Sequence, residues 1–488
     1  MCRMMFSAAA ILISCTYVAA ADSAASAPAA SQTAAASQPA GAFEGRARAL
    51  VEMLAKERFD QAYGRFDPTM RQVLPVEKLA QAWHELLDQA GPLQRIISVQ
   101  TQRINGYDAV YVTCQFDRQR LEVEIAYDEM GRMAGLHFVP ATLATGAITL
   151  PPYADPAAFE ERPVQVGAEG WPLPGTLTLP RRHRTASAPA SAPAASAPTT
   201  SAPAGIAPAD ALWPAVVLVH GSGPQDRDET LGANRPFRDL AWGLATRGIV
   251  VLRYEKRTQE HTMRVGTQLK TITVREEVID DAVTAVRRVM RVEGVDPNRV
   301  FILGHSFGGT LAPRIARAAD EVAGMVILAG TTRRLPEVIL DQARFLRALK
   351  GGPDSDEEQH LRWLTRQVKA AENPGLSIDT PAEDLPMGIP ASYWIDLRSY
   401  DPVATARLVG KPMLILQGGR DWQVTAADLA GWKTGLAGME NVQIKEYPAL
   451  NHLMIAGAGR STPLEYNQAG HVDAQVVGDI AEWILSQK

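Results

Sequence analysis

Residues 299–319 read RVFILGHSFGGTLAPRIARAA, and this stretch decides the fold of the larger part of the chain. It begins with an apolar run that is typical of a buried strand and ends with residues that suit a helix. Between the two lies Ser306, with Gly304 and Gly308 two residues away on either side. A serine in this setting predicts a nucleophile elbow, a strained turn that presents the hydroxyl group. Because 38 glycines in 488 residues can produce this spacing by chance, the neighbouring elements have to support it.

The segments around this stretch give that support. They alternate between helical stretches and short apolar runs, most of them without the polar alternation of a half-exposed strand. The strand-like runs lie at 161–167, 173–180, 214–221, 248–255, 299–306, 322–330, 411–419 and 442–448. We therefore expect residues 158–488 to form a doubly wound, mostly parallel α/β domain, with its sites at the carboxyl ends of the strands.

A serine nucleophile needs a histidine and a carboxylate, which in this kind of domain lie on loops after later strands. His452 follows the last predicted strand, whereas His360 lies in an acidic helical stretch and His471 precedes the last helix. Asp421 lies in the loop after the strand before it. The histidine would take the hydroxyl proton, and the carboxylate would orient its ring. We therefore predict a catalytic triad of Ser306, Asp421 and His452.

The same chemistry requires donors for the negative charge that develops on the substrate oxygen. One donor is expected to be the backbone N–H of Phe307, which follows the nucleophile. The other should lie in the motif HGSGP, with Ser222 as the first choice and Gly223 as the second. In the same region His220 is expected to shape the loop and His305 to pack beside the elbow.

The first twenty residues, MCRMMFSAAAILISCTYVAA, predict an export signal. Arg3 supplies an early positive charge, residues 4–13 are apolar, and small residues at 19–21 suit cleavage. We therefore expect residues 1–20 to be removed and the protein to reach the periplasm. The motif LISC also has the form of a lipobox, so a lipoprotein anchored through Cys15 stays open as an alternative.

Two Ala/Ser/Pro-rich segments, 21–42 and 185–205, contain too little apolar surface to fold, and we interpret them as a linker and a solvated insertion. Residues 43–140 begin with helical periodicity and continue with alternating strands separated by turn signals. This order predicts a small α+β domain, of unknown role, with helices followed by an antiparallel meander. Its lone histidines, His84 and His137, do not indicate a site.

The composition argues against several classes of function. The formal net charge is −5, so nucleic acid is not an expected partner. No stretch beyond the N-terminus reaches the roughly 18 apolar residues of a membrane-spanning helix.

Neither a metal nor a dinucleotide is expected, because zinc-ligand spacing and an early G-x-G-x-x-G motif are both missing. Cys114 is the one cysteine outside the leader, which argues against an internal disulfide. The sequence leaves the oligomeric state open.

Longer motifs add to this interpretation. They are LVHGSGPQDRDETLGANRPFRDLAWGLATRGIVVLRYEKRT (218–258), FILGHSFGG (301–309), YWIDLRSYDP (393–402), LILQGGRDWQVT (414–425) and LNHLM (450–454). Together they resemble the α/β-hydrolase superfamily and, within it, the bacterial carboxylesterases of the EstD type. The resemblance implies an α/β-hydrolase domain after a small N-terminal domain, carboxylesterase activity on short-chain esters without a cofactor, and the same triad. RYEKRT departs from the RYDKRG usual in such proteins, and the insertion at 185–205 is unusual for them.

Residues 331–400 do not continue the alternation of strands and helices, and we expect them to form a helical cap over the acyl site. Tyr393, Trp394 and Tyr400 are candidate walls of that pocket, although a packed helix pair without substrate contact fits the pattern equally well. The predicted function is an exported serine carboxylesterase acting on a small-molecule ester. A thioesterase, a peptidase and a non-catalytic binding protein with the same fold stay open as alternatives.

Overall fold

The computed structural model divides the chain into two compact units, residues 1–148 and 149–488, and each is described by itself. The structure describes residues 42–104, 107–118, 120–128, 130–140, 149–181, 212–261, 265, 271–350 and 355–487. The predicted signal peptide, the linker up to residue 41 and the insertion at 185–205 lie outside the described residues.

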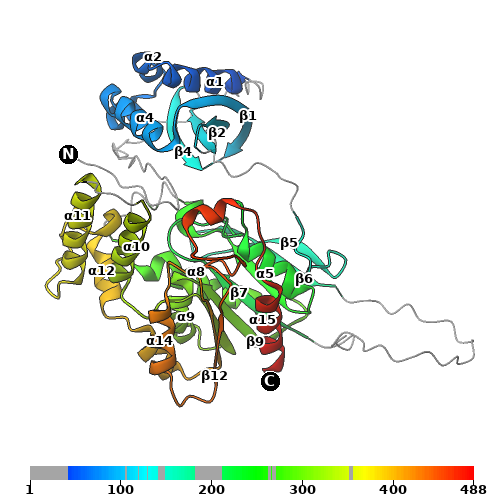
Figure 1. Ribbon diagram of the computed structural model, residues 1–488. Coiled ribbons are helices and arrows are strands. Elements are labelled where there is room, and N and C mark those ends of the chain that lie inside the picture. Colours follow the sequence, from blue (N-terminus) through cyan, green and yellow to red (C-terminus); the bar gives the residue numbers. More distant parts are fainter. Residues whose placement is uncertain are drawn as a thin grey trace, which may run out of the picture. The chain divides into compact units, whose positions relative to one another are not determined.

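The first unit consists of helices followed by an antiparallel sheet (Figure 1). The helices are α1 (Ala42–Ala55), α2 (Phe59–Tyr63), α3 (Pro68–Val73) and α4 (Val76–Ala90). The strands pair in the order of the chain and are β1 (Leu93–Ile104), β2 (Tyr107–Phe116), β3 (Arg120–Tyr127) and β4 (Met133–Pro140). The predicted α+β layout is therefore confirmed.

Alternation along the strands builds the core of this unit. Every second side chain of β2, from Val110 through Val112 and Cys114 to Phe116, is buried. Such a period places these side chains on one face of the sheet. Trp83 of α4 packs against this face, with its ring centroid 6.1 Å from that of Phe116. Burial also raises the pKa of the Cys114 thiol to about 12, so this thiol is unreactive.

The second unit is built on one mixed sheet of eight strands in the order β12-β11-β10-β9-β7-β8-β6-β5. Strands β7 to β12 run parallel, and β5 and β6 are antiparallel additions at one edge. The strands are β5 (Phe159–Val166), β6 (Leu173–Pro180), β7 (Trp213–Val219), β8 (Val250–Tyr254), β9 (Val295–His305), β10 (Gly324–Leu328), β11 (Met413–Gly418) and β12 (Val442–Tyr447). This confirms the predicted doubly wound, mostly parallel α/β-hydrolase fold.

Helices cover both faces of this sheet (Figure 1). Outside the segment 331–400, the helical elements are α5 (Pro236–Ala245), α6 (Arg257–Glu260), η1 (Arg275–Ile279), α8 (Asp280–Val289), α9 (Phe307–Ala318), α13 (Pro402–Val409), α14 (Ala426–Gly435), η4 (Pro463–Asn467) and α15 (Ala474–Ser486). Apolar side chains of α8 and α9 pack on one face, and those of α5 and α15 pack on the other.

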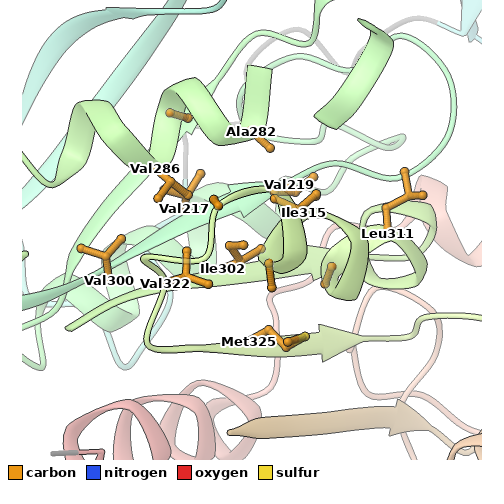
Figure 2. Packing of buried hydrophobic residues seen from close by; sticks show 14 of the residues in the cluster. Val217, Val219, Ala282, Val286, Val300, Ile302, Leu311, Ile315, Val322 and Met325 are labelled. Carbon is orange, nitrogen blue, oxygen red and sulfur yellow. The ribbon is translucent and has the colours of Figure 1, made fainter. Parts of the chain in front are cut away.

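The central strand β9 supplies side chains to both of these cores. Val300 and Ile302 join the cluster under α8 and α9, whereas Phe301 and Leu303 join the cluster under α5 and α15. Figure 2 shows the first cluster, in which Ile302 and its strand neighbours meet side chains of the two helices. Full burial of such a side chain contributes about 1.5–3 kcal/mol, so the strand before Ser306 is firmly fixed.

The order of the strands also predicts where a site forms. The chain passes from β7 to β8 on one side and then crosses to β9 on the other side of β7. Loops that leave β7 and β9 therefore diverge and open a crevice at the carboxyl ends of these strands. Ser306 follows β9, and the motif HGSGP follows β7.

The segment 331–400, between β10 and β11, is helical without a strand in its described part, and we call it the cap segment. It contains α10 (Leu335–Lys350), α11 (Ser355–Glu372), the turns η2 (Ala382–Asp384) and η3 (Pro386–Gly388), and α12 (Ala391–Arg398). These helices lie side by side (Figure 1) and contain small apolar clusters of their own.

Candidate active site

Ser306 lies at the junction between β9 and α9. Because β9 ends at His305 and α9 begins at Phe307, Ser306 alone makes the turn. Its φ of 53° and ψ of −119° are rare for a residue with a side chain. Backbone of this kind costs about 1–3 kcal/mol and occurs mostly at functional sites. The Ser306 N–H donates to the carbonyl oxygen of Leu328 on β10 at 2.8 Å, which holds the strained turn.

Gly304 and Gly308 make this turn sterically possible. A Cβ atom on Gly304 would lie 2.1 Å from the carbonyl oxygen of Gly308. A Cβ atom on Gly308 would lie 2.3 Å from the carbonyl oxygen of Val219, on the neighbouring strand β7. Both contacts involve backbone that cannot move aside, so only glycine fits at either position.

Asp421 and His452 are in direct contact at the ends of neighbouring strands. Asp421 follows β11 and His452 follows β12, and Oδ2 of Asp421 lies 2.6 Å from Nδ1 of His452. The other oxygen, Oδ1, accepts the backbone N–H groups of Gln423 at 2.8 Å and Val424 at 3.0 Å. A carboxylate held in this way accepts the Nδ1 proton and leaves Nε2 of the ring as the proton acceptor.

His452 also lies close to the elbow. Nε2 of His305, the residue before Ser306, lies 2.9 Å from the carbonyl oxygen of His452, and the ring centroids are 4.7 Å apart. None of the hydrogen bonds made by described residues joins Ser306 Oγ to His452. A general base often reaches hydrogen-bonding distance of its nucleophile only in the substrate complex. The structure thus brings Asp421 and His452 into contact beside the turn that carries Ser306.

The loop after β7 lies against Ser306. A Cβ atom on Gly221 would lie 3.1 Å from Cβ of Ser306 and 3.6 Å from its Oγ. Within the described chain, the N–H groups of Ser222 and Phe307 donate to no other residue. For Phe307 this is expected, because the first N–H groups of a helix lack an intrahelical acceptor. Both predicted oxyanion donors are therefore unpaired.

Charged side chains hold both backbone groups of Gly221. Its N–H donates to Oε1 of Glu229 at 2.6 Å, and its carbonyl oxygen accepts from Nζ of Lys256 at 2.9 Å. Oε2 of Glu229 lies 2.8 Å from Nδ1 of His305, so one carboxylate joins this loop to the elbow. Lys256 also pairs with Oε1 of Glu277 at 2.9 Å. We call these five residues the Gly221 network.

Sequence reasoning did not identify Lys256 and Glu277. Lys256 belongs to RYEKRT, one of the motifs that carry the family resemblance, and this was the available signal. Glu277 lies in η1, a π-helical turn, and such turns are frequent at functional sites. Glu229 belongs to QDRDE, in which the partly exposed Asp226, Arg227 and Asp228 form hydrogen bonds and ion pairs. Glu229 differs from them because its side chain is buried.

His220 packs beneath the loop as an uncharged ring. It lies 5.1 Å from the ring of Phe237 and 5.3 Å from that of Tyr254. Burial lowers the pKa of His220 to about 4, so the imidazole stays neutral at any pH near 7. Its Nε2 atom has no hydrogen-bond partner among the described residues. These contacts place His220 as packing for the loop after β7.

The three aromatic residues that sequence suggested as pocket walls lie in packed surroundings. Trp394 is buried in a small cluster within the cap segment, and its Nε1 donates to the carbonyl oxygen of Ile389 at 3.1 Å. The hydroxyl of Tyr400 donates to the carbonyl oxygen of Thr310 on α9 at 2.6 Å. The hydroxyl of Tyr393 donates to Oε2 of Glu277 at 2.5 Å. In the described structure none of the three rings contacts Ser306 through a hydrogen bond or a ring contact.

A different apolar cluster flanks the acid and the histidine. Trp422 follows Asp421 and Leu453 follows His452, and the two side chains share a cluster with Phe345 of α10. The rings of Trp422 and Phe345 stack with centroids 4.9 Å apart and planes inclined by 12°. The cap segment therefore contacts the loops that carry the predicted acid and base.

Other kinds of site receive no support. Among the residues that the structure describes, no group of three His, Cys, Asp or Glu side chains could hold a metal ion. Two surface hollows, of about 390 and 230 Å³, lie between α10 and α11 and beside α1 and β1, and neither includes Ser306. None of the described helices has the length and apolar character needed to cross a membrane.

Two protein families match this chain, one in each of its units. Residues 216–472 match the alpha/beta hydrolase family, and residues 47–136 match a family described as a protein of unknown function, DUF3887. Esterase EstD of Thermotoga maritima is 37% identical over 445 residues, which cover 91% of this chain and 96% of that protein. The resemblance to EstD-type proteins is therefore confirmed.

Solved structures of two esterases are also similar to this chain. An esterase of Pyrococcus furiosus matches with a TM-score of 0.39 and 13% identity, over 67% of this chain and 91% of that one. Est1E of Butyrivibrio proteoclasticus matches with a TM-score of 0.40 and 15% identity, over 67% of this chain and 98% of that one. From the family match over more than half of its length and from its relationship to EstD, the chain belongs to the alpha/beta hydrolase family.

Proposed function

We propose that the protein is an exported serine carboxylesterase that hydrolyses short-chain esters through an acyl-enzyme. One observation carries the proposal: the 2.6 Å contact between His452 and Asp421 lies beside the strained turn of Ser306. A nucleophile, a base and an orienting acid in this chain order are the parts that acyl transfer requires. The 37% identity to a protein named as an esterase supports an ester as the substrate.

In this mechanism Oγ of Ser306 attacks the ester carbonyl carbon while its proton passes to Nε2 of His452. Asp421 accepts the Nδ1 proton in a hydrogen bond and stabilises the imidazolium that forms. The N–H groups of Phe307 and Ser222 would bind the tetrahedral oxyanion. Collapse of the intermediate releases the alcohol, which takes the proton from His452 and leaves the acyl group on Ser306.

The second half of the reaction uses the same groups on a water molecule. His452 removes a proton from water as the oxygen attacks the acyl carbon, and a second oxyanion forms at the same site. Its collapse returns the proton to Oγ of Ser306 and releases the carboxylic acid. No cofactor takes part, since proton transfer and acyl transfer need only these side chains and backbone donors.

The bond type and chain length are the finer parts of the proposal. Thioesters and peptides react through the same apparatus, so a thioesterase and a peptidase are the alternatives. The apolar cluster around Trp422, Leu453 and Phe345 supports a substrate with a small apolar acyl group. A non-catalytic protein would have no need of a strained serine with two unpaired N–H groups beside it.

The test is hydrolysis of nitrophenyl esters, from acetyl to dodecanoyl, by wild type and by Ser306→Ala. We expect wild type to prefer short esters and the variant to lose at least roughly a thousand-fold in kcat. A fluorophosphonate should label wild type at Ser306 and leave the variant unlabelled. Equal rates for the two proteins would exclude the proposal, and inactivity of both on every ester would direct the search to thioesters and amides.

Export is tested separately. The apolar stretch 4–13 and the small residues at 19–21 support removal of residues 1–20. We expect the mature protein in the periplasmic fraction with an intact mass that begins at Ala21. A mass that begins at Cys15 with attached acyl chains, in the membrane fraction, would instead identify the lipoprotein. A full-length chain in the cytoplasm would exclude both.

A further inference from the structure

The carbonyl group of Gly221 is held by a buried lysine. Nζ of Lys256 lies 2.9 Å from the Gly221 oxygen, and the whole Lys256 residue is 3% exposed. Lys256 lies two residues after the end of β8, and β8 is the parallel neighbour of β7, so the two loops leave the sheet side by side. A buried ammonium group is costly, and one that donates to a backbone oxygen therefore calls for an explanation.

Peptide geometry gives Lys256 a consequence for the oxyanion site. The peptide between Gly221 and Ser222 is trans, because the described chain contains no cis peptide bond. In a planar trans peptide the C=O and the following N–H point in opposite directions. Lys256 draws the C=O of Gly221 to one side, so the N–H of Ser222 points to the other. The direction of the predicted oxyanion donor is thus set by Lys256.

Gly221 is also fixed from its other side. Its N–H donates to Oε1 of Glu229 at 2.6 Å, and its Cα faces Ser306 closely enough that a Cβ atom would lie 3.6 Å from Oγ. With both backbone groups held, the residue cannot rotate without breaking a charged hydrogen bond. Preorganised donors stabilise an oxyanion because they need no reorientation during the reaction.

Lys256 is in turn connected to the segment 331–400 through Glu277. Oε1 of Glu277 lies 2.9 Å from Nζ of Lys256, and Oε2 of Glu277 accepts the hydroxyl of Tyr393 at 2.5 Å. Tyr393 lies on α12 and is itself buried. A continuous chain of hydrogen bonds therefore runs from α12 through Glu277 and Lys256 to the backbone beside Ser306.

We propose that Lys256 is a positioning residue that orients the Ser222 N–H as an oxyanion donor, and that Glu277 and Tyr393 hold Lys256 in place. This inference rests on the serine esterase function proposed above and assigns no contact between Lys256 and the substrate. Loss of Lys256 should affect the transition state, in which the oxyanion exists, more than the bound ester.

The first experiment compares Lys256→Met with wild type in steady-state kinetics on nitrophenyl acetate. We expect kcat to fall by about 10- to 100-fold, somewhat less than the loss of an entire oxyanion donor, with KM nearly unchanged. Affinity for a trifluoromethyl ketone, which forms an oxyanion on Ser306, should fall in parallel with kcat/KM. Lys433→Met removes a lysine from an exposed pair with Glu446 and serves as the matched control with unchanged kcat.

A second variant separates positioning from loss of fold. Lys256→Met leaves Glu277 buried without its cation, so Lys256→Met/Glu277→Gln removes both charges and keeps a group that can accept from Tyr393. The double variant should keep the thermal transition of a folded protein and still show the lowered kcat. Ethylammonium should partly restore kcat in Lys256→Ala, because it supplies the missing ammonium donor. Tetramethylammonium should not, because it has no N–H to donate. Wild type measured with each cation corrects for aminolysis of the ester.

The outcomes distinguish this inference from the proposed function. Activity that survives Ser306→Ala would exclude the serine esterase itself. Loss of activity in Ser306→Ala with wild-type kcat in the folded double variant would overturn only the role of Lys256. A lowered kcat with unchanged affinity for the trifluoromethyl ketone would also overturn it, because oxyanion binding would then be intact.

Discussion

His305 holds the backbone of His452 while its own ring is held by a buried carboxylate. Its Nε2 lies 2.9 Å from the carbonyl oxygen of His452, and its Nδ1 lies 2.8 Å from Oε2 of Glu229. Both ring nitrogens thus face oxygen atoms that only accept hydrogen bonds, so both must carry protons. Burial alone would lower the pKa of His305, but the facing charge of Glu229 outweighs it and raises that pKa. The ring is an imidazolium paired with a carboxylate.

This pair predicts a pH dependence of stability. The pKa of His305 is raised in the folded protein. The stabilisation that His305 contributes is therefore complete below pH 6.5, its usual pKa, and is lost as the pH rises through its folded-state pKa. Burial alone would raise the pKa of Glu229, but His305 lowers it. The stabilisation that Glu229 contributes is complete above pH 4.5, its usual pKa, and is lost as the pH falls through its folded-state pKa. We expect the pair to stabilise the protein most between these two values, as thermal unfolding against pH would show.

Glu229→Gln tests the pair directly. Loss of the carboxylate leaves a buried imidazolium without its counter-ion, which typically costs about 3–5 kcal/mol. The variant should therefore have a lower Tm, and its Tm should change less with pH above 6.5 and below 4.5, where wild type loses the stabilisation from the pair. Glu57→Gln, which breaks the exposed pair of Glu57 with His84, should change Tm very little. A Glu229→Gln curve parallel to that of wild type would contradict the assignment of His305 as charged.

The glycines of the elbow predict a steric effect that is independent of chemistry. Gly308→Ala would place a methyl group 2.3 Å from the carbonyl oxygen of Val219, and this backbone lies in the central sheet. We expect a loss of several kcal/mol in the free energy of unfolding, together with loss of activity. Gly478→Ala on α15, where a Cβ atom would meet nothing within 4 Å, should instead stabilise the protein by about 0.5–1 kcal/mol. Equal urea midpoints for the two variants would contradict the close packing at the elbow.

The sequence was sufficient to predict most of the strands of the larger unit and the strand ends at which the candidate residues lie. Most of the parallel strands are apolar and buried, which located the ends of β9 and β11 and with them Ser306 and Asp421. The edge strand β12 is more polar, and His452 was placed by the short strand-like run VQIKEYP before it. Lys256 and Glu277 could not be identified in this way, because no local sequence pattern distinguishes a buried charged side chain from an exposed one. Their pairing brings together the segment after β8 and the helical turn η1, and only the three-dimensional fold shows that the two meet.

The aromatic residues of the cap show a second limit of the same kind. A helical pattern predicts that Trp394 is buried, but it does not predict which neighbours cover the ring. The structure packs Trp394 within the cap segment, whereas Phe345 reaches the loops of the acid and the histidine. Which side chain lines a site depends on the angle between helices, and short sequence windows do not carry that information.

Asp421→Asn tests the role of the acid. An amide in place of the carboxylate favours the wrong tautomer of His452 and removes the charge that stabilises the imidazolium, so kcat should fall by about 10³–10⁴. KM and Tm should change much less, because the amide keeps the size of the side chain. Asp473→Asn, at the start of α15, replaces one good N-cap with another and should leave kcat unchanged. Comparable kcat values for Asp421→Asn and wild type would leave Asp421 without a catalytic role.

Phe345→Ala tests whether the apolar cluster limits the acyl chain. The Phe345 ring stacks on Trp422 at 4.9 Å, next to Asp421 in the chain, so its removal would open apolar space beside the predicted acid and base. We expect the ratio of kcat/KM for decanoyl over acetyl esters to rise by about 10-fold, the scale on which pockets distinguish small differences in chain length. Trp363→Ala, which removes a partly exposed ring on α11, should leave the ratio unchanged. If both variants kept the wild-type profile, chain length would have to be set elsewhere on the loops around Ser306.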